Sequence, residues 1–436
     1  MVATDFTRWK YYAPRIRCLG CVPHRGERSL TYIDPEVINA VRLEPSLRLS
    51  NLRQIFWAPW NDDMFSDISP FIGSAVTHFS IICEDDDIDV DLPQVLLSLS
   101  LHCPSIQQVN IPHYFPVDLS SLVNRWDSLT YLKCVQSSFT ADGMAHLACL
   151  PNLARLDFLL LDGVHHKALS SASMCSAFPA LEKLSVATAH ITLITSFLDM
   201  VHSCRLRKIC IYLEVAPPLP ALQRFLRTLG TIRSHAIFDH LEINDGLEIH
   251  DTRYPQMNSC VVTPQDLEPL FSLKNIRHLS IDLDIVLAVD NAWLEVAAST
   301  WPHLHYLQIE DRVSPQIGPA SKITPVGLPV LAHLRELQFL MVRIDTRATN
   351  WSSKLGICST TVKTLRLDGS NIKDPLTDFR HLLDMFPRVN CVGVRGLRQE
   401  IRVAIEKMLR ENKRQRLATS SASGPYVYSS SLDTKI

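Results

Sequence analysis

One phrase recurs along this chain and limits what the chain can fold into. It consists of an apolar residue, two variable residues, a second apolar residue, one variable residue and a third apolar residue, as in Leu304-His-Tyr-Leu307-Gln-Ile309. Further copies have their three apolar residues at Leu334/Leu337/Phe339, Val362/Leu365/Leu367, Leu129/Leu132/Cys134, Leu153/Leu156/Phe158, Leu181/Leu184/Val186, Leu206/Ile209/Ile211 and Ile276/Leu279/Ile281. Weaker copies are Leu52/Ile55/Trp57, Val76/Phe79/Ile81, Ile106/Val109/Ile111, Phe238/Leu241/Ile243 and Val389/Val392/Val394. About thirteen copies follow one another at intervals of roughly 23 to 38 residues.

The phrase predicts one short strand per copy. Its last two apolar residues are two positions apart, so they share one face of a strand and point into a core. The residues beside them point to the other face. Successive strands that pair in parallel need a crossover of a dozen or more residues, and the segments between the copies are long enough to supply it.

Several of these segments predict helices. Residues 193–201, 222–229, 290–298 and 378–386 carry apolar residues at three- and four-residue steps, and the last two open on an acidic residue suited to a helix N-terminus, Asp290 and Asp378. A proline stands between helix and strand in the pairs Cys103-Pro104, Leu150-Pro151, Phe178-Pro179, Trp301-Pro302 and Phe386-Pro387. Proline cannot continue a helix, so it marks the change from helix to strand.

A series of helix, proline and strand is typical of an α/β leucine-rich-repeat solenoid, with parallel strands on the concave face and helices on the convex face. The alternative is an ordinary α/β domain, whose parallel strands are buried on both faces and nearly all apolar. Polar residues at outward positions favour the solenoid: Lys183, Ser185, His278, Ser280, Gln308 and Arg366.

The pattern divides the chain into four parts. Residues 1–45 are a lead-in to the array, and residues 46–396 hold the repeats. Residues 397–417 predict an amphipathic helix that caps the end of the array, as repeat proteins require. Residues 418–436, rich in Ser, Ala, Gly and Thr, predict a disordered tail. The basic cluster of residues 413–416 is either a charged helix end or a nuclear-import signal.

Net charge and hydropathy limit the classes of partner and the cellular compartment that we expect for this chain. The formal net charge is −2 and the pI is about 6.8, which gives no support to a nucleic-acid or anionic-membrane partner. The N-terminus lacks the apolar segment of a signal peptide, and no window approaches 18 uninterrupted apolar residues. We therefore expect a protein of the cytosol or nucleus whose 12 cysteines are reduced.

The run from Phe6 to Leu19, which contains Trp9, Tyr11, Tyr12 and Arg15-Ile-Arg-Cys-Leu19, resembles the segment after the F-box in fungal F-box proteins with leucine-rich repeats. Residues 301–307 and 324–334 resemble the same proteins. The resemblance implies an aromatic helix that leads into a first strand, and binding to a cullin-ligase adaptor through an F-box. The sequence itself contains no F-box phrase, so adaptor binding is expected only if an F-box exists upstream.

Three groups of residues carry side chains that could bind a metal or take part in catalysis. Cys18, Cys21 and His24 have metal-like spacing but lack the further ligands of a structural zinc site, and we expect apolar packing there. Residues 84–91 are dense in carboxylates without the glycine and final glutamate of a calcium loop, so a solvated loop is expected. His165 and His166, with Asp162 nearby, could bind a metal or move protons, but the sequence indicates no nucleophile that converges on them. No phosphate loop, nucleophile elbow or dinucleotide motif is present, and we expect neither metal nor cofactor nor catalysis.

A solenoid presents side chains from every strand on its concave face and binds an extended partner there. The outward residues best suited to bind a protein partner are Tyr131, Lys133, Arg155, Asp157, Lys183, Tyr212, His278, Asp282, Tyr306, Gln308, Glu336, Gln338, Arg366 and Asp368. The resemblance implies a substrate-recognition subunit of a cullin-type ubiquitin ligase. The alternatives are a free-standing binding scaffold and a GTPase activator of leucine-rich-repeat type.

Overall fold

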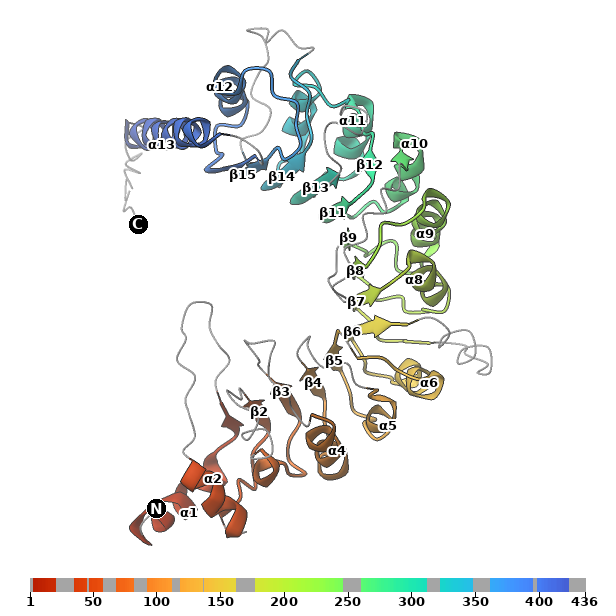
Figure 1. The fold of residues 1–436 in the computed structure, drawn as a ribbon, viewed down its shortest axis with the longest axis vertical. Helices are drawn as coiled ribbons and strands as arrows, with labels where there is room; N and C mark the ends of the chain where they lie inside the picture. Colours follow the sequence, from red (N-terminus) through yellow and green to blue (C-terminus); the bar gives the residue numbers. More distant parts are fainter. Residues whose placement is uncertain are drawn as a thin grey trace, which may run out of the picture. The chain divides into compact units, whose positions relative to one another are not determined.

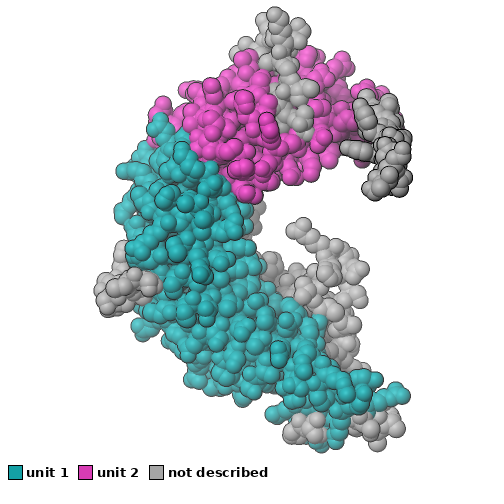
Figure 2. All heavy atoms as spheres, turned by 180° about the vertical axis from the view of Figure 1, so that it is seen from behind, with its two compact units in different colours: residues 1–256, 268–275 teal, residues 257–267, 276–436 magenta. Residues whose placement is uncertain are grey.

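The computed structural model describes residues 3–20, 35–44, 47–57, 68–81, 92–111, 118–135, 137–161, 177–245, 260–311, 322–347, 361–394 and 398–422. These residues form two compact units. Unit 1 comprises residues 1–256 and 268–275, and unit 2 comprises residues 257–267 and 276–436; Figure 2 shows them in teal and magenta.

In unit 1, parallel strands pair in the order in which they follow one another along the chain. The strands are β1 Cys18–Leu19, β2 Gln54–Trp57, β3 His78–Ile81, β4 Gln108–Ile111, β5 Tyr131–Cys134, β6 Arg155–Leu160, β7 Lys183–Thr188, β8 Lys208–Leu213 and β9 His240–Asp245. Helices run beside this row of strands (Figure 1). They are α1 Ala3–Tyr12, α2 Pro35–Leu43, α4 Leu92–His102, α5 Ser120–Val123, α6 Ala141–Cys149, α8 Ile191–Leu198 and α9 Leu219–Thr231, with short 3-10 helices at η1 Ala13–Arg15, η3 Ser69–Phe71 and η4 Glu268–Ser272.

Unit 2 repeats this arrangement with β11 His278–Leu283, β13 Tyr306–Asp311, β14 Phe339–Val342, β15 Thr364–Arg366 and β16 Cys391–Gly393, which also pair in parallel. Its helices are α10 Pro264–Leu267, α11 Asn291–Thr300, η5 Leu328–His333, α12 Pro375–Met385 and α13 Gln399–Ala422. Two further strands, β10 Val261–Val262 and β12 Val286–Leu287, pair with each other in a small parallel sheet.

The core of each unit is a ladder made by the middle apolar residue of the repeated phrase. In unit 1 the ladder runs through the register partners Ile55, Phe79, Val109, Leu132, Leu156, Leu184, Ile209 and Leu241, all buried. In unit 2 it runs through Leu279, Leu307, Leu340 and Leu365, likewise buried. The short strands β2 to β5 alternate half-buried and buried residues, so their other side chains form a second surface, here named the strand face.

The predicted α/β solenoid of parallel strands and helices is confirmed within both units. Proline follows the helix end at α4, α6, α11 and α12, as the sequence predicted. Phe178 departs from the expected extended backbone before proline. Its φ is 56°, its side chain is fully buried, and its N–H donates to the Ala148 carbonyl at 2.7 Å.

One predicted phrase is in the wrong frame. Leu340, not Leu337, is the register partner of Leu307, so the repeat there reads Leu337/Leu340/Val342. The error has a simple cause: apolar residues at 334, 337 and 340 offer the same three-residue spacing twice. Phe339, predicted to point into the core, is therefore the strand-face partner of Tyr306.

Two helix boundaries also differ from the prediction. Asp374, not Asp378, caps the N-terminus of α12, where its side chain accepts hydrogen bonds from Thr377. Asp378 lies inside that helix and is buried. The predicted capping helix of residues 397–417 is α13, which continues to Ala422, into the region predicted to be disordered. The remaining residues of that tail lie outside the described ranges.

Candidate functional site

In unit 1 the strand face carries one basic residue on each of three neighbouring strands. Arg155, Lys183 and Lys208, here named the basic row, are register partners across β6, β7 and β8. Arg155 and Lys183 are exposed and Lys208 is half-buried. Neighbouring parallel strands lie about 4.8 Å apart, so these like charges are crowded. Like charges at directly opposite positions of neighbouring strands repel each other and destabilise a sheet.

The neighbours of the basic row relieve part of this repulsion. The Arg155 guanidinium lies over the ring of Tyr131, 4.6 Å from its centroid. Asp157, on the same face of β6, feels the attraction of Arg155, Lys133, Lys208 and Lys183, but burial outweighs this attraction and raises the pKa of its carboxyl above the ordinary value. One poorly solvated carboxylate thus faces four cations, and the surface is basic on balance.

Beside the basic row, β8 and β9 bring together Cys210, His240 and Glu242, here named the β8–β9 cluster. The Cys210 thiol lies 3.3 Å from Glu242 Oε2, and His240 Nε2 lies 3.6 Å from the same oxygen. Hydrogen bonding from His240, above all, lowers the pKa of Glu242 to about 2, against the effect of burial. Burial, followed by the neighbouring Glu242 charge, raises the pKa of the Cys210 thiol to about 12. Burial likewise raises the pKa of the Tyr212 hydroxyl.

The strand face of unit 2 carries aromatic rings in place of basic residues. His278, Tyr306 and Phe339, here named the aromatic stack, are register partners on β11, β13 and β14. Their centroids are 4.0 and 4.1 Å apart, and neighbouring planes differ by 11° and 6°. The Tyr306 hydroxyl donates to Gln308 Oε1 at 2.6 Å, and Gln308 Nε2 donates to Glu310 Oε2 at 3.2 Å. A chain of hydrogen bonds therefore runs along β13 from the stack to a buried carboxylate.

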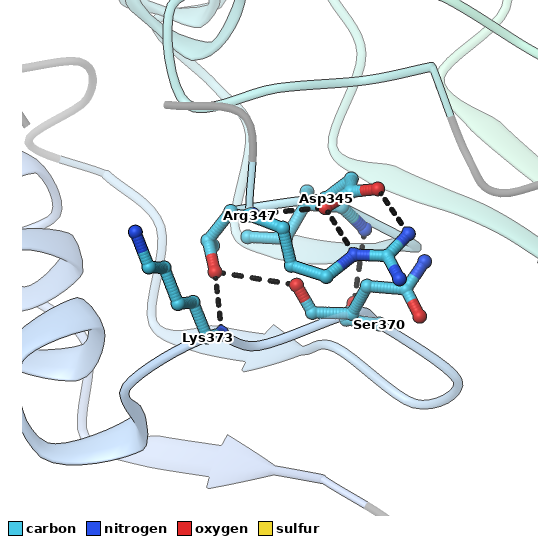
Figure 3. Close-up of polar contacts among 7 residues, drawn as sticks. Asp345, Arg347, Ser370 and Lys373 are labelled. Atoms are coloured by element: carbon cyan, nitrogen blue, oxygen red, sulfur yellow. Dashed lines mark hydrogen bonds and ion pairs between the residues drawn. The ribbon is translucent and has the colours of Figure 1, made fainter. Parts of the chain in front are cut away.

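In unit 2 the residues that follow β14 in the chain form a group of polar contacts around Asp345 and Arg347. Arg347 folds back onto Asp345, with Nε and Nη2 at 3.1 and 2.8 Å from the two carboxylate oxygens (Figure 3). This pairing lowers the pKa of Asp345. Ser370 accepts a hydrogen bond from the backbone N–H of Ile344 at 2.9 Å, and the backbone N–H of Lys373 donates to the Thr346 hydroxyl at 2.8 Å. These contacts join consecutive repeats, and we assign them a structural role.

A pocket of about 290 Å³ lies between the last strands of unit 2 and α13. Its lining includes Arg366, Asp368, Gly393, Arg402 and Glu406. Arg366 is paired with Asp368 at 2.6 Å. The Cβ of a larger residue at 393 would come within 3.1 Å of the Arg366 side chain, so Gly393 leaves the space that this arginine occupies.

The predicted partner-binding residues fall into three groups. Tyr131, Lys133, Arg155, Asp157, Lys183, Tyr212, His278, Asp282, Tyr306 and Arg366 lie on strands of the described structure, at positions that alternate with the core ladder. Gln308 lies on β13, and Asp368 follows the end of β15 by two residues. The two residues are only 9% and 6% exposed, because neighbouring groups cover them and pair with them.

Glu336 and Gln338 form the third group and correct the prediction. Both precede β14, because the repeat frame there is shifted by three residues. Glu336 instead accepts from His303 Nδ1 at 2.9 Å and lies 3.2 Å from His305 Nε2. The strand-face residues that the sequence reading missed include Lys208, Cys210, His240, Glu242, Phe339 and Met341. Counting alternate positions in every copy of the phrase would have found those on β8 and β9.

Other candidates from the sequence fall largely outside the described structure. Cys18 lies on β1, and its thiol donates to the Gly20 carbonyl at 3.7 Å, whereas Cys21 and His24 lie outside the described ranges. Residues 84–91 and the pair His165 and His166 lie outside them as well. Among the described helices, none is long and apolar enough to cross a bilayer.

The sequence matches no protein-family model and no curated protein. Among solved structures, it is similar to an internalin from Listeria monocytogenes, with 15% identity and a TM-score of 0.37 over 79% of this chain and 72% of that one. A leucine-rich-repeat protein from Leptospira interrogans has 11% identity and a TM-score of 0.41, over 88% and 97% of the two chains. TLR13, solved in complex with single-stranded RNA, has 14% identity and a TM-score of 0.40, over 79% of this chain and 46% of that one.

Proposed function

We propose that this chain is a protein-binding scaffold whose unit 1 strand face captures an acidic segment of a partner. The observation that carries the proposal is the basic row. Arg155, Lys183 and Lys208 stand in register on three adjacent strands, where their like charges repel one another. An acidic partner would neutralise this repulsion on binding, and complementary charge of this kind gives specificity and rapid association.

The geometry favours an extended segment that crosses the strands. Neighbouring strands lie about 4.8 Å apart, so the basic row spans about 9.6 Å, a length that about three residue steps of an extended segment cover. Tyr131 and the stem of Arg155 add apolar surface at one end of the basic row, and aromatic and arginine side chains are the residues that most often anchor an interface. The net charge of −2 argues against a general affinity for nucleic acid.

A random peptide library displayed on phage, selected against the full chain, tests this function. We expect enrichment of peptides rich in Asp and Glu. The double variant Arg155→Glu with Lys183→Glu should bind a selected peptide at least about 10-fold more weakly, since two favourable charge pairs become repulsive. The matched control, Arg224→Glu with Arg227→Glu on the exposed side of α9, makes the same change in net charge and should retain affinity.

Three outcomes would contradict the proposal. One is selection of peptides with no acidic bias. Another is equal loss of affinity in the α9 control, which would indicate a general charge effect. The third is tighter binding to a labelled single-stranded RNA than to the selected peptides, since that would place nucleic acid ahead of a protein partner.

A finer version of the same function is substrate recognition for a cullin-type ubiquitin ligase. Its support is the N-terminal arrangement that the family resemblance implied: α1 carries the aromatic residues and leads through η1 to the first strand, β1. This version is tested by immunoprecipitating the protein expressed from its native gene and measuring whether the cullin-ligase adaptor is precipitated with it. Absence of the adaptor would leave a scaffold that acts without a ligase.

A further inference from the structure

The β8–β9 cluster combines three kinds of donor atom on one face of the sheet. Cys210 and Glu242 are direct register partners on the two strands. His240 precedes Glu242 by two residues on β9, and residues two apart on a strand project to the same side. A sulfur, an imidazole nitrogen and a carboxylate oxygen therefore converge because of strand pairing, although 30 residues separate Cys210 from His240 in sequence.

The distances match the edges of a metal coordination polyhedron. Cys210 Sγ lies 3.3 Å and His240 Nε2 lies 3.6 Å from Glu242 Oε2, and all three atoms lie within 4.8 Å of one another. Zinc binds sulfur at about 2.3 Å and nitrogen or oxygen at about 2.0–2.2 Å, and tetrahedral angles then place ligand atoms about 3.3–3.6 Å apart. Two of the three edges therefore already have this length, and the third, between Cys210 and His240, is at most 4.8 Å.

A contact outside the three donors orients the carboxylate. Asn244 Nδ2 donates to Glu242 Oε1 at 2.8 Å, so the other oxygen, Oε2, is directed to Cys210 and His240. Hydrogen bonds that hold a ligand from behind in this way are a regular feature of protein metal sites. The side chains of His240 and Glu242 are 19% and 24% exposed, so an ion entering from solvent can reach them.

We infer that Cys210, His240 and Glu242 form a zinc-binding site with a fourth position open to water or to a ligand from outside the chain. Zinc accepts sulfur, nitrogen and oxygen donors together and is commonly tetrahedral. On binding, the Cys210 thiol proton passes to solvent, and the proton on His240 Nε2 moves to solvent or to Nδ1, so that the lone pair of Nε2 faces the ion. The thiolate and the Glu242 carboxylate then balance the two charges of the ion, so the nearby Lys208 faces a neutral group. The inference does not depend on the acidic partner proposed above.

Zinc titration of the full chain tests this inference. The protein is first stripped with a chelator, and binding is then measured by competition with a chromophoric zinc indicator. Cobalt(II) in place of zinc gives a sulfur-to-metal charge-transfer band that reports on thiolate ligation. We expect one zinc ion that Cys210→Ser, His240→Gln and Glu242→Gln each weaken by at least about 100-fold, because each removes a direct ligand.

The matched control is Cys204→Ser, which changes an exposed cysteine six residues away, outside the cluster. It should keep both the affinity and the cobalt band. Far-UV circular dichroism checks that each variant is folded, and Glu242→Gln, which keeps the shape of the side chain, serves if Cys210→Ser unfolds. The inference is overturned if equimolar zinc leaves the indicator unchanged, or if zinc binds and the cluster variants keep wild-type affinity, since the ion would then lie elsewhere.

Discussion

Tyr306 and Phe339 lie face to face at paired positions of β13 and β14, with ring centroids 4.1 Å apart and planes inclined by only 6°. Because the two side chains stand opposite each other on the strand face, Leu340 and not Phe339 enters the core. This contact fixes the repeat frame of β14, which two equally spaced sets of apolar residues leave open in the sequence.

The frame can be tested by comparing two alanine variants. We expect Leu340→Ala to lower the free energy of unfolding by about 2–5 kcal/mol, as for a fully buried leucine. Phe339→Ala should cost about 1 kcal/mol, the order of one aromatic contact on a half-covered surface. Urea denaturation followed by circular dichroism measures both. A larger loss for Phe339→Ala than for Leu340→Ala would restore the frame first predicted.

Asp378 holds the start of α12 to the preceding repeat. Its Oδ2 accepts from the Thr346 hydroxyl at 2.6 Å and from the backbone N–H groups of Lys373 and Asp374, both at 3.1 Å. Asp378→Ala removes the acceptor that these three donors share, although the Thr346 hydroxyl also donates to the Asn371 carbonyl and the Lys373 N–H to the Thr346 hydroxyl. We expect a loss of about 1–3 kcal/mol in the free energy of unfolding.

Two further variants in α12 serve as controls for the Asp378→Ala measurement. Asp378→Asn keeps an acceptor oxygen and should lose less than the alanine variant. Asp384→Ala, on the exposed side of the same helix, should change stability by less than about 0.5 kcal/mol. Equal losses at positions 378 and 384 would show that the hydrogen bonds of Asp378 do not matter.

The pair of Asp345 and Arg347 predicts a dependence of stability on pH. Hydrogen bonds from Arg347 lower the pKa of the Asp345 carboxyl, so the folded state favours the ionised form. The stabilisation is therefore complete above the ordinary carboxyl pKa and is lost as the pH falls through the lowered value. We expect Arg347→Gln to lower the melting temperature at pH 7 and to have little effect at a pH where Asp345 is protonated.

Arg335→Gln, which removes another exposed arginine of unit 2, is the control for that experiment. Its effect should not follow the titration of Asp345. Melting curves of wild type and both variants, recorded from pH 7 downward, give the comparison. A difference between wild type and Arg347→Gln that stays constant over this range would contradict the assignment.

Asp157 predicts a pH dependence of stability that is opposite in sign to that of Asp345. Burial raises the pKa of its carboxyl despite the surrounding cations, so the folded state binds the proton more readily than the unfolded chain does. Its contribution to stability therefore grows as the pH falls through the raised pKa. We expect Asp157→Asn to leave the melting temperature unchanged or higher at pH 7. A clear loss of stability at pH 7 would show that attraction to the basic residues outweighs burial.

The sequence by itself determined the class of fold and most of the core. Apolar residues at fixed intervals can be buried together only if each copy supplies a strand with the same face inward, so Leu132, Leu156 and Leu184 could be assigned to one ladder without coordinates. Proline after the helices and the cap at Asp290 were equally local signals, since each acts through the backbone of neighbouring residues.

The tertiary structure alone decided which strand-face residues meet. Phe339 could be placed opposite Tyr306 only once β14 had paired with β13, because the apolar spacing around residue 337 permits two registers. The β8–β9 cluster is similar: Cys210 and Glu242 are 32 residues apart and carry no motif spacing. Their contact depends on the length of the crossover through α9, which sets the register of two strands. Periodicity specifies which face a residue occupies, whereas strand register specifies its neighbour.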